Sequence, residues 1–300
     1  MRTTRHSLLA VQCPRFDTQQ THPLAYKLTR MSAHANTGTV LDRILDARRA
    51  AVDHRKRVLP ETALKYGVKA ASPLRDFAVA LSRDGLNVIA ELKPASPSQG
   101  VIRDPFDPVA LAQSLATAGA AALSVLTEPE FFGGSLKNMR DARKEIAAPV
   151  LRKDFIFDPW QVWESRANDA DSFLLIVAML DDLLLRELMF LGRQLGMEPL
   201  IEVHTAAELD RALAAGGRII GVNNRDLRTL DVRLQTSLEL INLIPEDRIA
   251  VAESGLSTHA HLVRLRGAGF DAFLIGEHLM RADDPAAALG DLLRTAPAAE

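Results

Sequence analysis

The sequence predicts an α/β fold, a (β/α)8 TIM barrel with extra N-terminal helices. From residue 88 onward, short apolar runs alternate with longer helical patterns, and there are eight such runs. A brief apolar run closed by turn residues is typical of a strand buried in a parallel sheet, and the helical stretches between the runs can serve as crossovers. The eight predicted strands are Val88 to Leu92, Ala121 to Leu126, Val150 to Arg152, Ser172 to Val177, Pro199 to Val203, Ile219 to Asn223, Ile249 to Ala252 and Phe273 to Ile275.

The ends of the predicted helices support the same repeat. Four segments carry small or glycine residues where a helix C-cap needs a positive φ, and each continues at once into a predicted strand. Helix starts are marked by Asp107 and Asp158, each before a proline, by Thr205, and by Ser257 or Thr258. The four C-terminal segments are residues 118–126, 167–176, 214–222 and 267–276.

Two helices are predicted ahead of the barrel. Residues Val40 to Val58 place apolar side chains at helical spacing, and Pro60 stops this helix. Apolar residues between positions 74 and 81 suggest a second, short helix before the first strand. We therefore expect residues 39–300 to form a single barrel domain that includes both helices.

Residues 1–38 lie outside this repeat, and we expect them to be a disordered extension. Residues 1–30 hold five basic side chains against one acid, which faintly resembles a transit peptide, but they lack the apolar core of a secretory signal. Met31 could begin a more ordinary amino terminus.

Composition limits the class of function. The 300 residues are 47% hydrophobic, and a net charge of −2 gives no sign of a nucleic-acid or membrane surface. No apolar run approaches the roughly 18 residues of a membrane span. Cys13 is the only cysteine, which rules out an intrachain disulfide and fits a reducing, cytoplasmic compartment. The histidines have no metal-ligand spacing, so we expect no metal or other cofactor, and a monomer is the simplest expectation for the assembly.

Polar residues follow seven of the eight predicted strands, and the fourth strand alone offers none. A barrel places its active site at the carboxyl ends of its strands, so these side chains are expected to face one mouth. An unpaired buried charge is costly, which makes one shared site the simpler interpretation. The residues concerned are Glu91 and Lys93, Thr127 and Glu128, Lys153 and Asp154, Glu202 and His204, Asn223, Asn224 and Arg225, Glu253, Ser254 and Gly255, and Gly276.

The end of the first strand gives the richest of these signals. Glu91 and Lys93 lie two residues apart, so their side chains project from the same face of the strand. Ser96, Ser98 and Gly100 follow, with hydroxyls and open backbone N–H groups suited to an anion. Taken alone, the stretch fits a structural ion pair beside a proline turn equally well.

The last two strands indicate a phosphate site. Gly255 and Gly276 would let backbone amides approach a ligand closely, and the loops after strands seven and eight are the usual phosphate site of such barrels. For either glycine alone, a tight turn is the simpler explanation. Glu277 would repel a phosphate, so we expect its side chain to turn away while its N–H donates.

Seven motifs, in order and at the right strands, closely resemble the indole-3-glycerol phosphate synthase family. The resemblance runs from about Val40 to the carboxyl terminus, and it identifies the chain as a member of that family. The motifs are ELKPASPSQG (91–100), EPEFFGGS (128–135), LRKDFIFDPWQV (151–162), MEPLIEVH (197–204), GVNNRDL (221–227), AESG (252–255) and FLIGEHLM (273–280).

The resemblance implies a lyase of tryptophan biosynthesis. Its substrate would be 1-(o-carboxyphenylamino)-1-deoxyribulose 5-phosphate, converted to indole-3-glycerol phosphate with loss of carbon dioxide and water. The chemistry needs a proton donor for the ketone oxygen and then a second acid and base for dehydration. In the family pattern Lys153 is the acid of ring closure, and Glu202 and Lys93 are candidates for dehydration. Glu91 and Glu253 would hold the lysines protonated.

The resemblance also implies the substrate contacts. Ser96, Gly255, Gly276 and the backbone near Glu277 match the family's phosphate contacts, and Ser254 belongs to the same motif. Phe132 matches an aromatic residue that packs on the anthranilate ring. This chain departs from the pattern at Glu277 and His278, where many relatives carry serine, so side-chain contacts to phosphate are in doubt there. Asn223 and Arg225 would orient the substrate or the carboxylates, and the helix Val40 to Val58 resembles one that covers the barrel mouth.

Two other classes of protein share parts of this pattern. A sugar-phosphate aldolase would use Lys153 as a Schiff-base amine, but a Schiff-base lysine needs a lowered pKa, and the carboxylates at this mouth would raise it. A non-catalytic barrel would have the fold alone, and it would tolerate neutralisation of the residues at the mouth.

Overall fold

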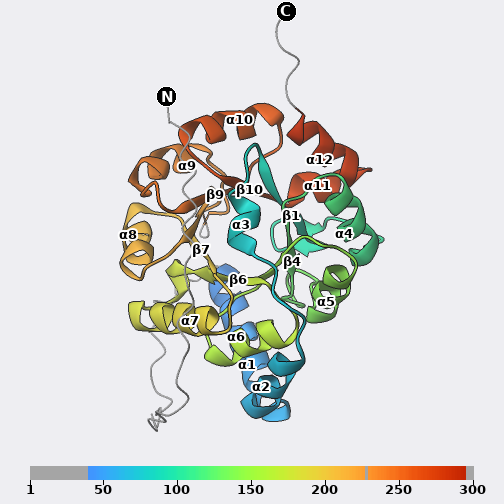
Figure 1. Ribbon diagram of the computed structural model, residues 1–300, viewed down its shortest axis with the longest axis vertical. Coiled ribbons are helices and arrows are strands. Elements are labelled where there is room, and N and C mark those ends of the chain that lie inside the picture. The colour runs from blue at the N-terminus through green and yellow to red at the C-terminus, as the bar shows by residue number, and fades with distance from the viewer. Residues whose placement is uncertain (1–39, 227–228, 295–300) are drawn as a thin grey trace, which may run out of the picture. The chain divides into compact units, whose positions relative to one another are not determined.

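Eight parallel strands form a closed barrel in the computed structural model, which describes residues 40–226 and 229–294. Hydrogen bonds between β1 and β10 complete the ring, and helices surround it (Figure 1). The barrel strands are β1 (Asn87–Leu92), β4 (Ala122–Leu126), β5 (Val150–Lys153), β6 (Ser172–Ile176), β7 (Leu200–Val203), β8 (Ile219–Asn223), β9 (Ile249–Glu253) and β10 (Ala272–Ile275). The predicted barrel and all eight of its strands are confirmed.

The small differences in strand ends matter for the site. β5 extends to Lys153 and β9 extends to Glu253, one residue beyond each predicted end. Both charged residues are therefore held by strand hydrogen bonds, which fix the backbone more firmly than a loop would. The register sets Asn223 opposite Glu253, and Glu202 opposite Gly221. Neighbouring strands thus bring the predicted polar residues to one level of the barrel.

The helices between the strands begin where the sequence predicts. Asp107, Asp158, Thr205 and Thr258 each cap a helix by accepting a backbone N–H in the first turn. The helices are α4 (Pro108–Thr117), α5 (Leu136–Lys144), α6 (Pro159–Ala167), α7 (Asp182–Gln194), α8 (Ala206–Ala214), α9 (Gln235–Leu240), α10 (His259–Ala268), α11 (Glu277–Arg281) and α12 (Pro285–Leu293), with short 3₁₀ turns at Val177–Met179 and Ile241–Leu243.

Left-handed residues end four of these helices, as the sequence predicts. Gly119, Gly216 and Gly269 have φ of 103°, 84° and 119°, and Asp169 takes the same role with φ of 64°. Aspartate tolerates this conformation better than most residues with a side chain. In each case the chain turns directly into the next strand.

Between residue 40 and the first barrel strand the structure has three helices, and the sequence predicts two of them. α1 (Val40–Val58) has the predicted bounds, whereas α3 (Phe77–Leu81) is shorter than expected. α2 (Glu61–Ala70) begins directly after Pro60, so the proline separates two helices. α2 packs against α6, and α3 packs against β1 and β4, where it lies in front of the strands in Figure 1.

α1 is attached to the barrel by both apolar and ionic contacts. Ile44 and Leu45 belong to the main core, and Val52 packs in a smaller cluster with Leu64 and Trp160.

The expected disordered extension, residues 1–38, lies outside the residues that the structure describes. Among the described residues, no helix is long and apolar enough to cross a membrane.

Candidate active site

Lys153 lies between two carboxylates at the mouth of the barrel. Its Nζ donates to Oε2 of Glu202 at 2.9 Å and to Oε2 of Glu253 at 2.8 Å. The three residues come from the ends of β5, β7 and β9, so only the closed barrel brings them together. The lysine side chain is 15% exposed, whereas the carboxylates are 3% and 1% exposed. The ammonium therefore faces the mouth and the carboxylates lie beneath it.

Burial and charge act on Lys153 and Glu202 in opposite directions. Burial alone lowers the pKa of Lys153, but Glu202, Glu253 and Glu91 outweigh it and raise that pKa well above its ordinary value. Burial alone raises the pKa of Glu202, but Lys153 and His204 outweigh it and hold that pKa far below its usual range. At neutral pH the site therefore contains an ammonium donor next to an ionised carboxylate.

Glu253 differs from Glu202 although both contact the same lysine. Burial raises the pKa of Glu253 to about 7, and the attraction of Lys153 only partly offsets this. Its Oε1 is buried and has no hydrogen-bond partner among the described residues. A Cβ on Gly221 would stand 2.1 Å from this oxygen, so a glycine is needed there to make room for the carboxylate.

Glu91 and Lys93 form an ion pair on the other side of the mouth. Nζ of Lys93 lies 2.9 Å from Oε1 of Glu91, and Ser124 donates to Oε2 of Glu91 at 3.4 Å. A Cβ on Gly276 would stand 2.5 Å from Oε1 of Glu91, so this glycine leaves space for the pair. Lys93 is 17% exposed, which leaves its ammonium accessible from the mouth.

Asn223 connects the carboxylate cluster with the loop after β9. Its Nδ2 donates to Oε1 of Glu202 at 3.1 Å, and its Oδ1 accepts from Ser254 Oγ at 2.8 Å. The backbone N–H of Arg225 donates to the same Oδ1 at 3.0 Å. Ser254 has φ of 67°, a left-handed conformation that strains a residue with a side chain and is typical of functional sites.

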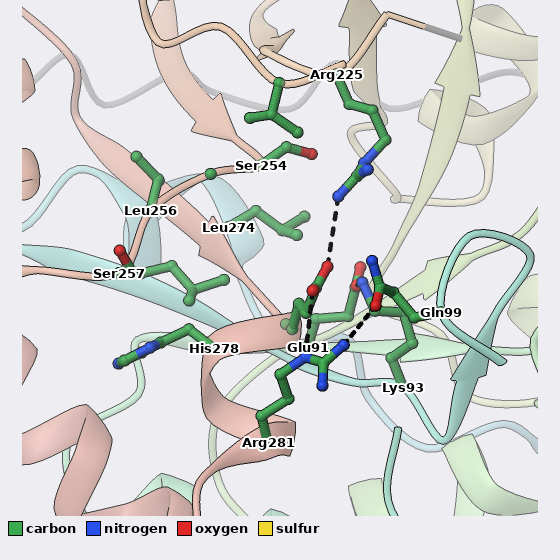
Figure 2. A pocket seen from close by; sticks show the side chains of 15 residues that line it. Glu91, Lys93, Gln99, Arg225, Ser254, Leu256, Ser257, Leu274, His278 and Arg281 are labelled. Carbon is green, nitrogen blue, oxygen red and sulfur yellow. Dashed lines mark hydrogen bonds and ion pairs between the residues drawn. The ribbon is translucent and has the colours of Figure 1, made fainter. Parts of the chain in front are cut away.

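A pocket of about 430 Å³ opens beside this cluster. Gly255 and Gly276 line it, together with Ser254 and Ser257, and Figure 2 shows Arg225 and Arg281 approaching it from opposite sides. The chain turns at Gly255 with φ of 76°. The pocket has the backbone amides and cations that a phosphate group requires.

Glu277 does not turn away from this pocket, contrary to the expectation from the sequence. Its carboxylate lies 3.4 Å from Nη2 of Arg225 and 3.2 Å from Nε of Arg281, and the residue lines the pocket. The two guanidinium groups attract the side chain inward. Arg281 also donates to Gln99 at 2.6 Å, which links α11 to the loop after β1 (Figure 2).

A second, mostly apolar pocket of about 120 Å³ adjoins the first, and Lys93, Arg225 and Glu277 line both. Phe132, which is expected to pack on the ring of the substrate, lies in this pocket with its ring centroid 5.9 Å from that of Phe155. Ser96, expected among the phosphate contacts, lines this pocket and not the first. Sequence reasoning missed five apolar residues of its lining: Leu41 and Ile44 of α1, Pro97, Phe155 and Leu230.

The sequence profile of the indole-3-glycerol phosphate synthase family matches residues 41–292. This match covers α1, the whole barrel and every residue of the two pockets. The chain belongs to the indole-3-glycerol phosphate synthase family.

Curated relatives agree with this assignment over nearly their whole length. An indole-3-glycerol phosphate synthase of Laribacter hongkongensis (strain HLHK9) is 47% identical over 258 residues, which cover 84% of this chain and 98% of the relative. One of Burkholderia vietnamiensis (strain G4 / LMG 22486) is 46% identical over 254 residues, covering 83% and 97%. At this identity the chain shares the enzyme class of its family, a carboxy-lyase of tryptophan biosynthesis.

Similar solved structures add support for the fold alone. A 3-hexulose-6-phosphate synthase superposes with a TM-score of 0.53 at 15% identity, covering 69% of this chain and 97% of that one. The structure described as KGPDC from Streptococcus mutans in complex with D-R5P gives a TM-score of 0.56 at 15% identity, covering 69% and 94%. Both likenesses are confined to the architecture.

Three polar residues expected at the mouth of the barrel have contacts that stabilise the local structure. Asp154 binds Arg48 and Arg152 at 2.6 and 2.9 Å and accepts from Thr127 at 2.6 Å. Glu128 accepts the backbone N–H groups of residues 130–132 and so shapes the loop that carries Phe132. The sequence places these residues at strand ends but cannot show that long-range partners engage them.

The spacing of the histidines in the sequence gives no expectation of a metal site. Among the described residues, no group of three or more His, Cys, Asp or Glu side chains could hold a metal ion. His259 and His261 lie on the outer helix α10, as predicted. His204 lies beside Glu202, as its two-residue spacing suggested, with Nε2 3.3 Å from Oε1.

Proposed function

We propose that this chain converts 1-(o-carboxyphenylamino)-1-deoxyribulose 5-phosphate to indole-3-glycerol phosphate, with Lys153 as the acid of ring closure. One observation supports these roles above all: a pocket lined by Arg281 among other charged residues and an apolar pocket share Lys93, Arg225 and Glu277, beside the Lys153 cluster. The substrate has the matching form, a phosphate at one end and an aromatic ring at the other.

Ring closure requires a proton donor at the ketone oxygen. The ring carbon that carries the carboxylate attacks the ketone carbon, and Lys153 gives its proton to the oxygen as the new carbon–carbon bond forms. The carboxylate then leaves as carbon dioxide, and the electrons of the broken bond restore the aromatic ring. Glu202 and Glu253 keep Lys153 charged for this step, since both lie within 2.9 Å of its Nζ.

Dehydration requires an acid and a base. Lys93 is the proposed acid, because its ammonium is held at the mouth by Glu91. Glu202 is the proposed base, because its ionised form is strongly favoured. The hydroxyl left by ring closure departs as water with a proton from Lys93, and Glu202 takes the proton from the substrate that completes the double bond.

The substrate's phosphate is proposed to bind at the amides of Gly255, Gly276 and Glu277, near Ser254. Its ring is proposed to pack on Phe132, with Ser96 bordering the same pocket. Arg225 lines both pockets and can contact the phosphate or the atoms beside it. We further propose a cytoplasmic monomer, which gel filtration with light scattering would test.

An activity assay tests the function directly. Purified protein and the carboxyphenylamino substrate should give rising indole fluorescence and one carbon dioxide per product. Borohydride added during turnover should trap no adduct, because a charged Lys153 cannot attack a carbonyl. A reduced adduct at Lys153, seen by mass spectrometry, would favour the aldolase chemistry instead.

A further inference from the structure

His204 joins Glu202 to a second carboxylate outside the barrel. It directly follows β7, and its backbone N–H donates to Oε2 of Glu208 at 2.8 Å. Its ring Nδ1 lies 3.1 Å from the same oxygen. Glu208 lies in the first turn of α8, so one carboxylate fixes both the backbone and the ring of His204.

The other ring nitrogen faces the active site. Nε2 lies 3.3 Å from Oε1 of Glu202 and is fully buried, but in this arrangement it is not aligned for a hydrogen bond. The same Glu202 oxygen accepts from Asn223 at 3.1 Å, while Lys153 takes the other oxygen. A small rotation of the Glu202 carboxylate would align it with Nε2.

We propose that His204 is a positioning residue for Glu202, an imidazolium oriented by Glu208 that holds the carboxylate in place and in its ionised form. The inference rests on the proposed function, because it assigns a role relative to the base of dehydration. The chain Glu208, His204, Glu202 resembles other sites in which a carboxylate fixes the ring of a catalytic histidine.

Electrostatics agrees with this geometry. Burial alone lowers the pKa of His204, but the contacts with Glu202 and Glu208 outweigh it and raise the pKa to about 10. These two carboxylates, from β7 and α8, contact the ring directly, and the ammonium of Lys153 lies on the far oxygen of Glu202. A positively charged His204 ring offsets part of the negative charge of Glu202. Without it, Lys153 alone would balance the carboxylates of both Glu202 and Glu253.

Three substitutions separate position from charge. His204→Gln can place a neutral N–H near the position of Nε2, whereas His204→Asn keeps a donor only near Nδ1. Glu208→Gln removes the carboxylate that orients the ring. His259→Asn is the matched control, since Nδ1–H of His259 donates one hydrogen bond at 2.8 Å to the Leu292 carbonyl on the outer surface of the barrel.

Steady-state kinetics from pH 3 to 9 provide the test, because the pKa of Glu202 lies far below its usual range. We expect His204→Asn to lower kcat about tenfold with KM within twofold, as for an interaction made in the transition state. The acid limb of its kcat profile should move up by roughly half a pH unit or more, because Glu202 loses a cation that favours its charged form. His204→Gln should recover part of kcat, and Glu208→Gln should add little to His204→Asn in the double variant.

Other results would overturn the inference. An unchanged kcat and acid limb in His204→Asn would show that the ring has only a packing role, whatever happens to the melting temperature. Fully additive losses in the double variant would show that Glu208 does not act through His204. The wild-type assay separates this inference from the proposed function. If wild-type protein forms no product, the proposed function is contradicted. If wild-type protein turns over normally and the His204 variants have unchanged kinetics, only the inference is contradicted.

Discussion

Glu202 and Glu253 show how surroundings set the role of a residue. Both carboxylates contact Nζ of Lys153, yet the pKa of Glu202 is lowered and that of Glu253 is raised to about 7. Glu202 also has His204 and Asn223 near its second oxygen, whereas the second oxygen of Glu253 is buried without a partner in the described region. Glu202 is therefore ionised at neutral pH, as the proposed base of dehydration must be, whereas Glu253 gains and loses its proton near neutral pH.

Glu202→Gln should lower kcat by about 10² or more while KM changes little, since an acid–base contact acts mainly in the transition state. Fluorescence-monitored kinetics at neutral pH check this. Glu198→Gln is the control, because Glu198 pairs with Arg193 at 2.7 Å away from the mouth. A Glu202→Gln enzyme with nearly normal kcat and a greatly raised KM would instead make Glu202 a binding residue.

Gly221→Ala should damage both stability and activity, because the added methyl group would stand 2.1 Å from Oε1 of Glu253. Overpacking of this kind costs about 1–3 kcal/mol. Gly290→Ala is a matched change with open space around the new methyl group, and in a helix it should stabilise by up to about 1 kcal/mol. Denaturant melts of both variants decide the matter, and equal free energies of unfolding would contradict the steric account.

At the scale of elements, α1 connects to the active site through a buried ion pair. Arg48 binds Asp154 through two hydrogen bonds of 2.9 and 2.6 Å, and Asp154 directly follows Lys153. The same helix supplies Leu41 and Ile44 to the apolar pocket. Docking of α1 thus supports both the backbone of the proposed acid and the wall of the ring pocket.

Arg48→Ala should destabilise the protein by about 3–5 kcal/mol, because it leaves a buried carboxylate with less compensation. Arg152 still contacts Asp154, which places the cost toward the lower end of that range. Arg49→Ala removes the neighbouring arginine, whose 3.3 Å pair with Asp46 is at the surface and should be worth under about 1 kcal/mol. Similar losses for the two variants, measured by urea unfolding, would argue against a buried clamp.

Sequence patterns predicted most elements because their signals are local. Capping aspartates, C-terminal glycines and apolar runs lie within a few residues of the elements they define. α2 was missed because Pro60 provides no side-chain cap and Gly67 interrupts the helix. Its support is long-range: the Cβ position of Gly67 lies 3.2 Å from Cβ of Ala167 in α6. This contact between α2 and α6 cannot be predicted from the sequence alone.

At the scale of the whole molecule, the barrel decides which strand-end residues meet. The prediction that Lys153, Glu202 and Glu253 converge followed from topology alone, and the structure brings them within 2.9 Å. The inward position of Glu277 was not predictable, because it depends on Arg225 from the loop after β8 as well as on Arg281 of its own helix. The position of a residue at a strand end predicts where its side chain lies. The residues that it contacts in the folded chain decide how that side chain is oriented.

Stability should fall in alkaline solution because of His204. Its folded-state pKa, raised to about 10 from 6.5, means that its contribution is complete below pH 6.5 and is lost as pH rises through 10. Relative to His204→Gln, wild-type protein should lose on the order of 3 kcal/mol of unfolding free energy between pH 7 and 10. Urea titrations at several pH values check this, and parallel pH curves for the two proteins would contradict it.

The central claim is that Lys153 donates the proton that drives ring closure. The most direct measurement compares kcat/KM of Lys153→Ala with that of wild-type protein at neutral pH, with indole fluorescence as the signal. Lys137→Ala is the control, because Lys137 forms an exposed ion pair with Asp141 on α5. We expect kcat/KM of Lys153→Ala to fall by a factor of about 10² to 10⁴, which is the usual contribution of a general acid. The circular dichroism of the variant should stay native, and the control variant should keep wild-type activity. Retention of more than about a tenth of wild-type activity would contradict it, because that loss is far below what a general acid contributes.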